Sequence, residues 1–425
     1  MSRHGRPSIV LVAHFCPFPP THGNRRRLLT LIRWLKGRGF ALTFVLQPMD
    51  VEDPRGLAQL EAEVDRLEIV PAPSGDWGPR SLRLAARVAR GVLPRRVAAG
   101  LREYVIRQRT SGREVEETWS ADGIGGDRHI DRWCWPATSR RVNRAVRRDR
   151  PIAVIAEYAL LSKCFEAIAP PTLRVIDTHE VFFRNPERFQ VEGLSAPFIC
   201  SPESEVQALD RADVLIAIQA NDARALRARL PAKHVITVSH VSPDGHGREA
   251  GAIRRGAVLY VASSNPFNAH ALREFLAHAW PSIVTRVPGA TLRVVGSVPV
   301  PPGAEARGVV AVGRVSDEDL AREYRAAHVV VNPQVAGTGL KIKCVEALAA
   351  GCPLVTRPAG ADGLEEGAGT AFLVAEDWPT FAGHVVTLLT DETARGRLED
   401  GARGFAATRF SADRTFAELD RVLRG

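Results

Sequence analysis

Short apolar runs alternate with segments of helical periodicity along most of the chain, and this alternation constrains the fold more than any other feature. Helical segments separate most of these runs, whose lengths suit buried strands. In the N-terminal half the predicted strands are 8–15, 41–46, 67–72, 152–158, 173–179, 213–219 and 234–241. Such alternation predicts parallel strands joined by right-handed crossovers, and therefore a doubly wound α/β domain.

The alternation stops at residues 242–256, which are rich in glycine and polar residues and show no periodicity. It then resumes, and the chain from Trp378 onward is helical in pattern. The second set of predicted strands is 257–263, 290–297, 309–315, 328–333, 353–356 and 370–375. We therefore predict two Rossmann-like doubly wound domains that face a cleft, formed by residues 1–245 and 246–425, with residues 242–256 as the hinge.

Composition excludes several classes of protein. With 425 residues, of which 45% are hydrophobic, the chain can bury two cores. No apolar run is long enough to span a membrane, and the start MSRHGRPSIVLVAHF lacks the features of a signal peptide, so we expect a cytoplasmic protein. The six cysteines form no Cys-x-x-Cys pair and lie mostly in apolar surroundings, which favours buried thiols over disulfides or metal ligands. We expect no metal.

The net charge of +9 is compatible with a polyphosphate, nucleic acid or an anionic membrane surface. Nucleic acid is disfavoured because only 6% of residues are aromatic and no nucleic-acid-binding module is visible. Residues 80–109 hold nine arginines against one acid, Glu103, interleaved with apolar residues. This pattern fits a basic amphipathic helix on an anionic membrane, and equally a solvated helical face.

Two lysines mark the strongest candidate site. The chain has five lysines among 57 basic residues, yet two of them, Lys341 and Lys343, stand just before Glu346 in the stretch GTGLKIKCVEALAAG. This stretch follows a predicted strand, so its loop and helix N-terminus belong at the carboxyl edge of a sheet, where anions bind. The ammonium groups predict a diphosphate ligand, and the carboxylate predicts contact with ribose hydroxyls. The alternative is a solvated pair of lysines and a glutamate that favours the helix start.

Other candidates lie at predicted strand ends and in the loops that follow. His179 stands beside carboxylates and is a candidate polar group at the reacting centre. Gly23 would let the backbone approach a ligand at the start of the first helix, and Arg25 is the arginine of the following triplet that we expect to face it. Further candidates at such positions are Glu157, Tyr158, Glu180, Arg184, Gln219, Ser264 and Asn268. For Ser264 and Asn268, capping of a helix is the alternative role.

The order of four motifs resembles the retaining glycosyltransferases of family 4, which have the two-domain architecture called GT-B. It resembles in particular the branch from bacterial exopolysaccharide clusters. The resemblance covers nearly the whole chain. Each motif alone is moderately specific, and the four motifs in this order indicate the family strongly. The motifs are PFPPTHGNRRR (17–27), IDTHEVFFR (176–184), RADVLIAIQ (211–219) and GTGLKIKCVEA (337–347).

The resemblance implies a metal-independent enzyme that transfers a sugar from a nucleotide diphosphate-sugar to an acceptor hydroxyl, with retention of configuration. It makes the N-terminal domain the acceptor side and the C-terminal domain the donor side, with the last helices packing back on the N-terminal domain. Glu346 would be the second glutamate of the family's Glu-x7-Glu element, where Thr338 replaces the first. The other implied donor contacts are Gly313, Arg314, Gly337, Gly339 and Leu340.

The sequence leaves other functions open. A nucleotide-sugar epimerase or hydrolase uses the same architecture, and a natural-product tailoring transferase would use a small soluble acceptor. Thr338 in place of glutamate also fits a catalytically silent binding subunit. Under the preferred interpretation the acceptor is lipid-linked or a growing polysaccharide, and residues 80–109 hold the enzyme on the inner face of the membrane.

Overall fold

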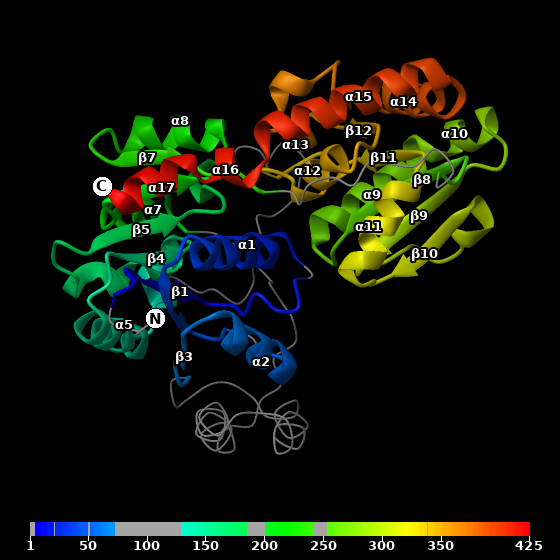
Figure 1. Cartoon of the computed structure of the whole chain (residues 1–425). Helices are drawn as coiled ribbons and strands as arrows, with labels where there is room; N and C mark the ends of the chain where they lie inside the picture. The colour runs from blue at the N-terminus through cyan, green and yellow to red at the C-terminus, as the bar shows by residue number, and fades with distance from the viewer. Residues whose placement is uncertain are drawn as a thin grey trace.

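The structure, a computed structural model, describes residues 5–20, 22–49, 52–72, 129–184, 200–241, 253–337 and 339–425. Two separate parallel sheets with helices on both faces form the molecule (Figure 1). Every segment predicted as a strand contains one, and the predicted α/β class is confirmed. The basic segment 80–109, Thr338 and most of the predicted hinge lie outside the described residues.

The N-terminal domain is built on a seven-stranded sheet in the order β3-β2-β1-β4-β5-β6-β7, with all pairs parallel. Its strands are β1 (Ser8–Ala13), β2 (Ala41–Leu46), β3 (Arg66–Ile69), β4 (Ala153–Glu157), β5 (Leu173–Asp177), β6 (Val214–Ala217) and β7 (His234–Thr237). Its helices are α1 (Gly23–Gly37), α2 (Pro54–Glu63), α5 (Pro136–Asp149), α7 (Pro202–Asp210) and α8 (Ala220–Arg229), with 3₁₀ turns η2 (Ile130–Trp133), η3 (Ala159–Ala167) and η4 (Phe182–Arg184).

The C-terminal domain has a six-stranded parallel sheet in the order β10-β9-β8-β11-β12-β13. Its strands are β8 (Ala257–Ala262), β9 (Thr291–Gly296), β10 (Val309–Gly313), β11 (Val329–Asn332), β12 (Leu354–Thr356) and β13 (Leu373–Val374). The helices along this part of the chain are α9 (Pro266–His278), α10 (Trp280–Arg286), α11 (Asp317–Ala326), α12 (Ile342–Ala349), α13 (Pro358–Ala361), α14 (Trp378–Thr390), α15 (Glu392–Arg409), α16 (Ala412–Thr415) and α17 (Ala417–Arg424), with turns η6 (Glu305–Arg307) and η7 (Glu365–Gly367).

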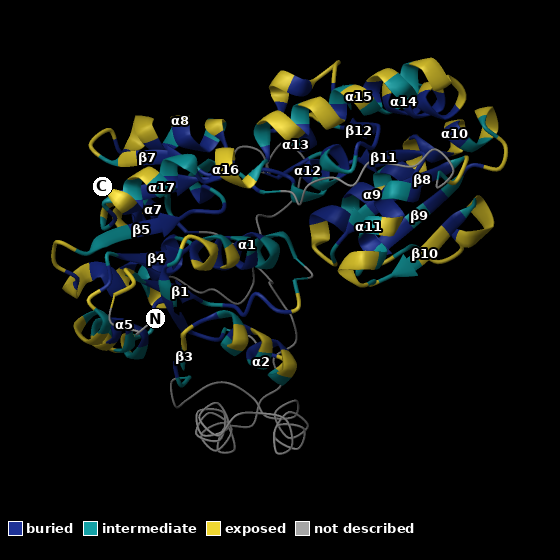
Figure 2. Cartoon of the chain, viewed as in Figure 1, coloured by how far each residue is buried: buried dark blue, intermediate teal, exposed yellow. Residues whose placement is uncertain are grey.

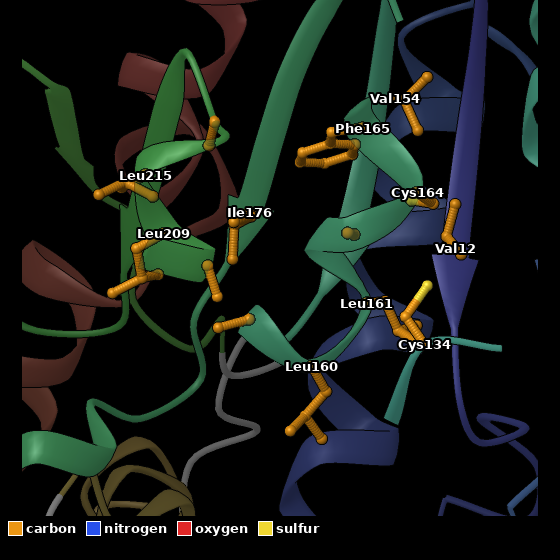
Figure 3. Packing of buried hydrophobic residues seen from close by; sticks show 14 of the residues in the cluster. Val12, Cys134, Val154, Leu160, Leu161, Cys164, Phe165, Ile176, Leu209 and Leu215 are labelled. Carbon is orange, nitrogen blue, oxygen red and sulfur yellow. The ribbon is translucent and has the colours of Figure 1, made fainter. Parts of the chain in front are cut away.

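Both faces of the N-terminal sheet are buried, because its strands have apolar residues on both sides of the pleat. In β1, Ile9 and Leu11 join one core with α1, while Val10 and Val12 join a second core on the opposite face. Figure 3 shows part of that second core, where Phe165 packs among strand residues. The outer faces of the helices carry the exposed residues (Figure 2). All six cysteines are buried and free, as predicted.

The last helix, α17, returns to the N-terminal domain (Figure 1). Leu419 and Leu423 of α17 belong to the core under α1, and Phe416 stacks on Trp34 with ring centroids 4.4 Å apart. The backbone N–H of Thr237 at the end of β7 donates to Glu418 (2.8 Å). The chain therefore crosses between the domains twice. No described helix is long and apolar enough to cross a bilayer.

Candidate functional site

The loop before α12 lies at the carboxyl end of β11, as the sequence predicted. Gly337 and Gly339 have φ of +110° and +79°, a backbone conformation that glycine adopts without strain. Lys341 is the N-cap residue of α12, and its Nζ donates to the carbonyl oxygens of Gly337 (3.2 Å) and Gly339 (2.8 Å). The ammonium group of Lys341 therefore stabilises the conformation of this loop. Leu340 packs in the core behind the loop.

Lys343 points from the first turn of α12 toward the start of α9. Its Nζ donates to Asn268 Oδ1 (2.8 Å) and lies 5.1 Å from the centre of the Tyr260 ring. Burial lowers the pKa of Lys343 to about 8, and nearby Lys341 also acts to lower it. The Nδ2 of Asn268 donates to the backbone and side-chain oxygens of Ser263, so the amide is oriented with its oxygen toward the lysine. These contacts hold the ammonium group of Lys343 in a fixed position, where it can pair with an anion.

Glu346 accepts hydrogen bonds on both carboxylate oxygens. Arg26 Nη1 donates to Oε1 (2.8 Å), and the hydroxyl of Tyr324 donates to Oε2 (3.1 Å). Burial raises the pKa of Glu346, and the bonds to Arg26 and Tyr324 oppose that shift. Arg26 comes from α1, so this ion pair joins the two domains. The same guanidinium donates to Asp317 at the start of α11 (2.7 Å).

The N-termini of α1 and α12 meet between the two sheets. Gly23 begins α1, and a β-carbon there would lie 2.7 Å from Ile342 Cδ1 at the start of α12. Gly23 thus allows close approach of the opposite domain, whereas the sequence suggested close approach of a ligand. Two helix N-termini direct unpaired N–H groups and partial positive charge to one place, which favours anions.

A cluster of buried side chains lies at the ends of β4 and β5. His179 Nε2 contacts Glu157 Oε2, and the His179 ring stacks on Tyr158 with centroids 4.3 Å apart. Tyr158 and His179 both have positive φ, +63° and +54°, a conformation that is uncommon for non-glycine residues and enriched at functional sites. Burial raises the pKa of Glu157, and His179 opposes the shift. This cluster faces the second domain, because a β-carbon at Gly339 would lie 3.6 Å from His179 O.

Glu157, Asp177 and His179 are spaced as metal ligands can be, with candidate ligand atoms within 4.8 Å of one another. Arg27 donates to both oxygens of Asp177, at 2.9 and 3.0 Å, and this ion pair is buried. A metal ion here would have to compete with the guanidinium for that carboxylate.

A second contact between the domains lies at the end of β6. Gln219 Nε2 and Asn221 Nδ2 donate to the two oxygens of Asp362, at 3.0 and 2.8 Å. Arg184 pairs with Asp222 and lies 3.9 Å from Asp362. Gln219 and Arg184, two of the candidates at predicted strand ends, here contact the opposite domain.

The other predicted residues lie apart from these contacts. Arg25 donates to the carbonyl of Phe18 (3.1 Å) and lies 3.8 Å from Glu52, within its own domain. Ser264 and Arg314 are exposed in loops of the C-terminal domain, and Gly313 ends β10 with a positive φ. Glu180 is near the Gly339 loop, since a β-carbon at Gly339 would lie 3.7 Å from Glu180 Cβ.

Sequence reasoning passed over three residues that join this site: Arg26, Tyr324 and Asp317. Arg26 stands between two other arginines in α1. Helical geometry points the three side chains in different directions, but it does not determine which of them faces the second domain. Tyr324 lies 22 residues before Glu346 and has no motif of its own. Asp317, in the first turn of α11, has the ordinary role of an acid near a helix N-terminus.

Comparison with known proteins identifies the C-terminal domain. Residues 255–391, which make up most of it, match the family model described as Glycosyl transferases group 1. The predicted resemblance to glycosyltransferases is therefore confirmed for this segment, at the level of group 1. A search of curated protein sequences finds no significant match.

Solved structures of glycosyltransferase architecture match the whole chain. Sucrose-phosphate synthase from Thermosynechococcus elongatus has a TM-score of 0.65 at 16% identity, over 99% of this chain and 98% of that chain. HepE from Anabaena, in complex with UDP, has a TM-score of 0.63 at 14% identity, over 98% and 99%. A TarM variant from S. aureus, in complex with Fondaparinux, alpha-GlcNAc-glycerol and UDP, has a TM-score of 0.66 at 9% identity, over 99% and 100%. These matches confirm the predicted two-domain GT-B fold.

Proposed function

We propose that this protein is a retaining glycosyltransferase that moves a sugar from a nucleotide diphosphate-sugar to an acceptor hydroxyl. The observation that carries the proposal is the grouping of Glu346, Lys343 and the converging N-termini of α1 and α12 at the carboxyl end of β11. A carboxylate suited to ribose and cationic groups suited to a diphosphate stand side by side. The family match of residues 255–391 supports the same conclusion.

The donor would bind with its ribose on Glu346 and its diphosphate at the two helix N-termini. Lys343 and the backbone N–H groups would stabilise the charge that grows on the leaving diphosphate as the anomeric bond breaks. Lys341 would contribute indirectly, by donating hydrogen bonds to the carbonyl oxygens of Gly337 and Gly339 and so fixing the conformation of the loop. In this arrangement the protein supplies the positive charge that a metal provides in other transferases.

His179 would lie beside the reacting sugar. It belongs to the N-terminal domain, and its carbonyl oxygen would lie 3.6 Å from a β-carbon added at Gly339, in the loop that precedes Lys341. Glu157 contacts Nε2 at the edge of its ring, and Tyr158 stacks on the face of the ring. Retention of configuration rests on the motif resemblance alone, and we assign no nucleophilic carboxylate. Closure of the domains over the sugar would exclude water and limit hydrolysis.

Uridine nucleotides are the first donors to test. The structures of HepE were obtained with UDP and with UDP-glucose, and the TarM variant was obtained with UDP. The acceptor that we propose is lipid-linked or a polysaccharide, held near an anionic membrane by the basic segment 80–109. Flotation with anionic and neutral liposomes tests this part, and equal recovery with both would contradict it.

The decisive experiment combines binding and product analysis. Calorimetry with UDP, GDP, ADP and TDP identifies the base, and NMR of the product formed with acceptor reports its anomeric configuration. We expect Glu346→Gln to weaken nucleotide binding about tenfold or more, because it removes charge-assisted hydrogen bonds. The matched control Glu392→Gln changes an exposed glutamate of α15 and should leave binding unchanged.

Because Glu346→Gln also removes the ion pair with Arg26, the same change is made in an Arg26→Ala background, and unchanged affinity there would contradict the ribose role. Conversion of the nucleotide-sugar in the absence of any acceptor would favour an epimerase or hydrolase. Loss of transfer on addition of EDTA would overturn the metal-independent part of the mechanism.

A further inference from the structure

Arg26 makes three hydrogen bonds that together connect the two domains. Its Nε donates to the carbonyl of Pro20 (2.9 Å), its Nη1 to Glu346 (2.8 Å) and its Nη2 to Asp317 (2.7 Å). The guanidinium is thus fixed from one side by the loop before α1 and from the other by two carboxylates of the C-terminal domain. Glu346 is the carboxylate that our proposed function assigns to the ribose.

We propose that Arg26 occupies the position on Glu346 that the ribose takes, and that the nucleotide must displace it to bind. This inference rests on the proposed function, because it concerns the same carboxylate. It adds a residue of the opposite domain as a competitor of the ligand. The contact between Arg26 and Glu346 then lowers nucleotide affinity by the free energy needed to break it.

The low exposure of Glu346 shows why displacement is required. Its side chain is 13% exposed, with Arg26 against Oε1 and Tyr324 against Oε2, so a ribose can reach the carboxylate only where one of these two groups moves away. Tyr324 is buried, with 4% of its surface exposed, and comes from the same domain as Glu346. Arg26 comes from the other domain, so a small separation of the domains removes it without disturbing a core.

The strength of this contact is substantial because the pair is shielded from solvent. The side chains of Arg26 and Glu346 are 23% and 13% exposed. Burial acts to lower the pKa of Arg26, but Glu346 and Asp317 outweigh that effect and the pKa is raised. Charge-assisted hydrogen bonds of this kind are stronger than neutral ones.

Asp317 offers a way to weaken the contact without altering Glu346. Its carboxylate is 62% exposed and holds the second terminal nitrogen of Arg26. Exposed ion pairs contribute little, so its loss should loosen Arg26 only slightly. The chain therefore provides a graded series, in which Arg26→Ala removes the competitor and Asp317→Asn weakens its anchor.

The test measures the affinity of UDP, GDP, ADP and TDP for wild type and three variants by calorimetry at pH 7.5. Arg26→Ala should bind the preferred nucleotide about tenfold more tightly, since a charge-assisted contact no longer has to be broken. Asp317→Asn should shift affinity in the same direction by a smaller factor. The control Arg33→Ala removes an exposed arginine on the same helix that pairs with Glu63, and should not change affinity.

Small-angle scattering gives a second readout. If the nucleotide displaces Arg26, its addition to wild type should change the radius of gyration, and Arg26→Ala should already differ from wild type when empty. Weaker or equal nucleotide binding by Arg26→Ala would overturn this inference and leave the proposed function standing. Absence of nucleotide binding in both proteins would overturn the proposed function, and this inference with it.

Discussion

At the scale of single residues, burial of Lys343 fixes the position of its ammonium group and lowers its pKa. The side chain lies in the first turn of α12, held by Asn268 and the face of the Tyr260 ring. Its lowered pKa, about 8, follows from burial first and from neighbouring Lys341 second. A bound diphosphate would favour the ammonium form, because an adjacent negative charge raises the pKa of a lysine.

This pKa predicts a pH dependence of nucleotide binding. Below about pH 8 Lys343 is an ammonium and can pair with the diphosphate, and above it the group becomes neutral. We expect the Kd for the nucleotide diphosphate to rise by up to about tenfold per pH unit above this value. Calorimetry between pH 7 and 9.5 measures it.

The nucleoside without phosphates provides the control, since it shares any ionisation of the base, and the ratio of the two Kd values isolates the effect of Lys343 on the diphosphate. Lys343→Arg should remove the dependence, because arginine stays protonated throughout. A flat profile for the diphosphate in wild type would show that Lys343 does not contact it.

At the scale of elements, helix α7 holds the loop that follows His179. The sequence SPESE begins the helix: Ser201 accepts from Ser204 N, and Pro202 stands at the first helical position. Glu205 then projects to the neighbouring loop, where its two oxygens accept from the backbone N–H groups of Phe182 (2.9 Å) and Phe183 (2.6 Å). One side chain thereby fixes the backbone just beyond the proposed site.

Glu205→Ala should destabilise the fold, because it leaves two backbone N–H groups without their acceptor. We expect the free energy of unfolding to fall by about 2–6 kcal/mol, at roughly 1–3 kcal/mol for each of the two unpaired N–H groups. Glu203→Ala, an exposed change in the same helical turn, should cost only a few tenths of a kcal/mol. Denaturant unfolding followed by circular dichroism compares the two, and equal losses would refute the role of Glu205.

At the scale of the whole molecule, the two domains touch at two polar contacts on either side of the His179 cluster. Arg26 forms one of them, and Gln219 with Asp362 forms the other. The second requires Gly363, where φ is +80° and a β-carbon would lie 1.9 Å from Gln219 Oε1 and 2.8 Å from Gln219 Cβ. A side chain at this position cannot be accommodated while the domains stay in contact.

Gly363→Ala should therefore separate the domains at this contact. We expect a larger radius of gyration by small-angle scattering and a lower rate of transfer. Gly369→Ala is a matched control, because Gly369 has φ of +79° but no atom within 4 Å of the added carbon. It carries the same backbone strain without the interdomain clash. If both variants scatter like wild type, the contact at Gly363 does not hold the domains together.

The sequence by itself determined the two doubly wound sheets and the place of the glycine-bearing loop before α12. Strand periodicity and helix signals act over short distances, so each predicted strand was found within a few residues of its position, and Lys343 and Glu346 fell at a strand's carboxyl end. It could not determine which of Arg25, Arg26 and Arg27 crosses to the other domain. That choice depends on how α1 is rotated over its sheet and how the sheets face each other, and these follow from packing between residues hundreds of positions apart.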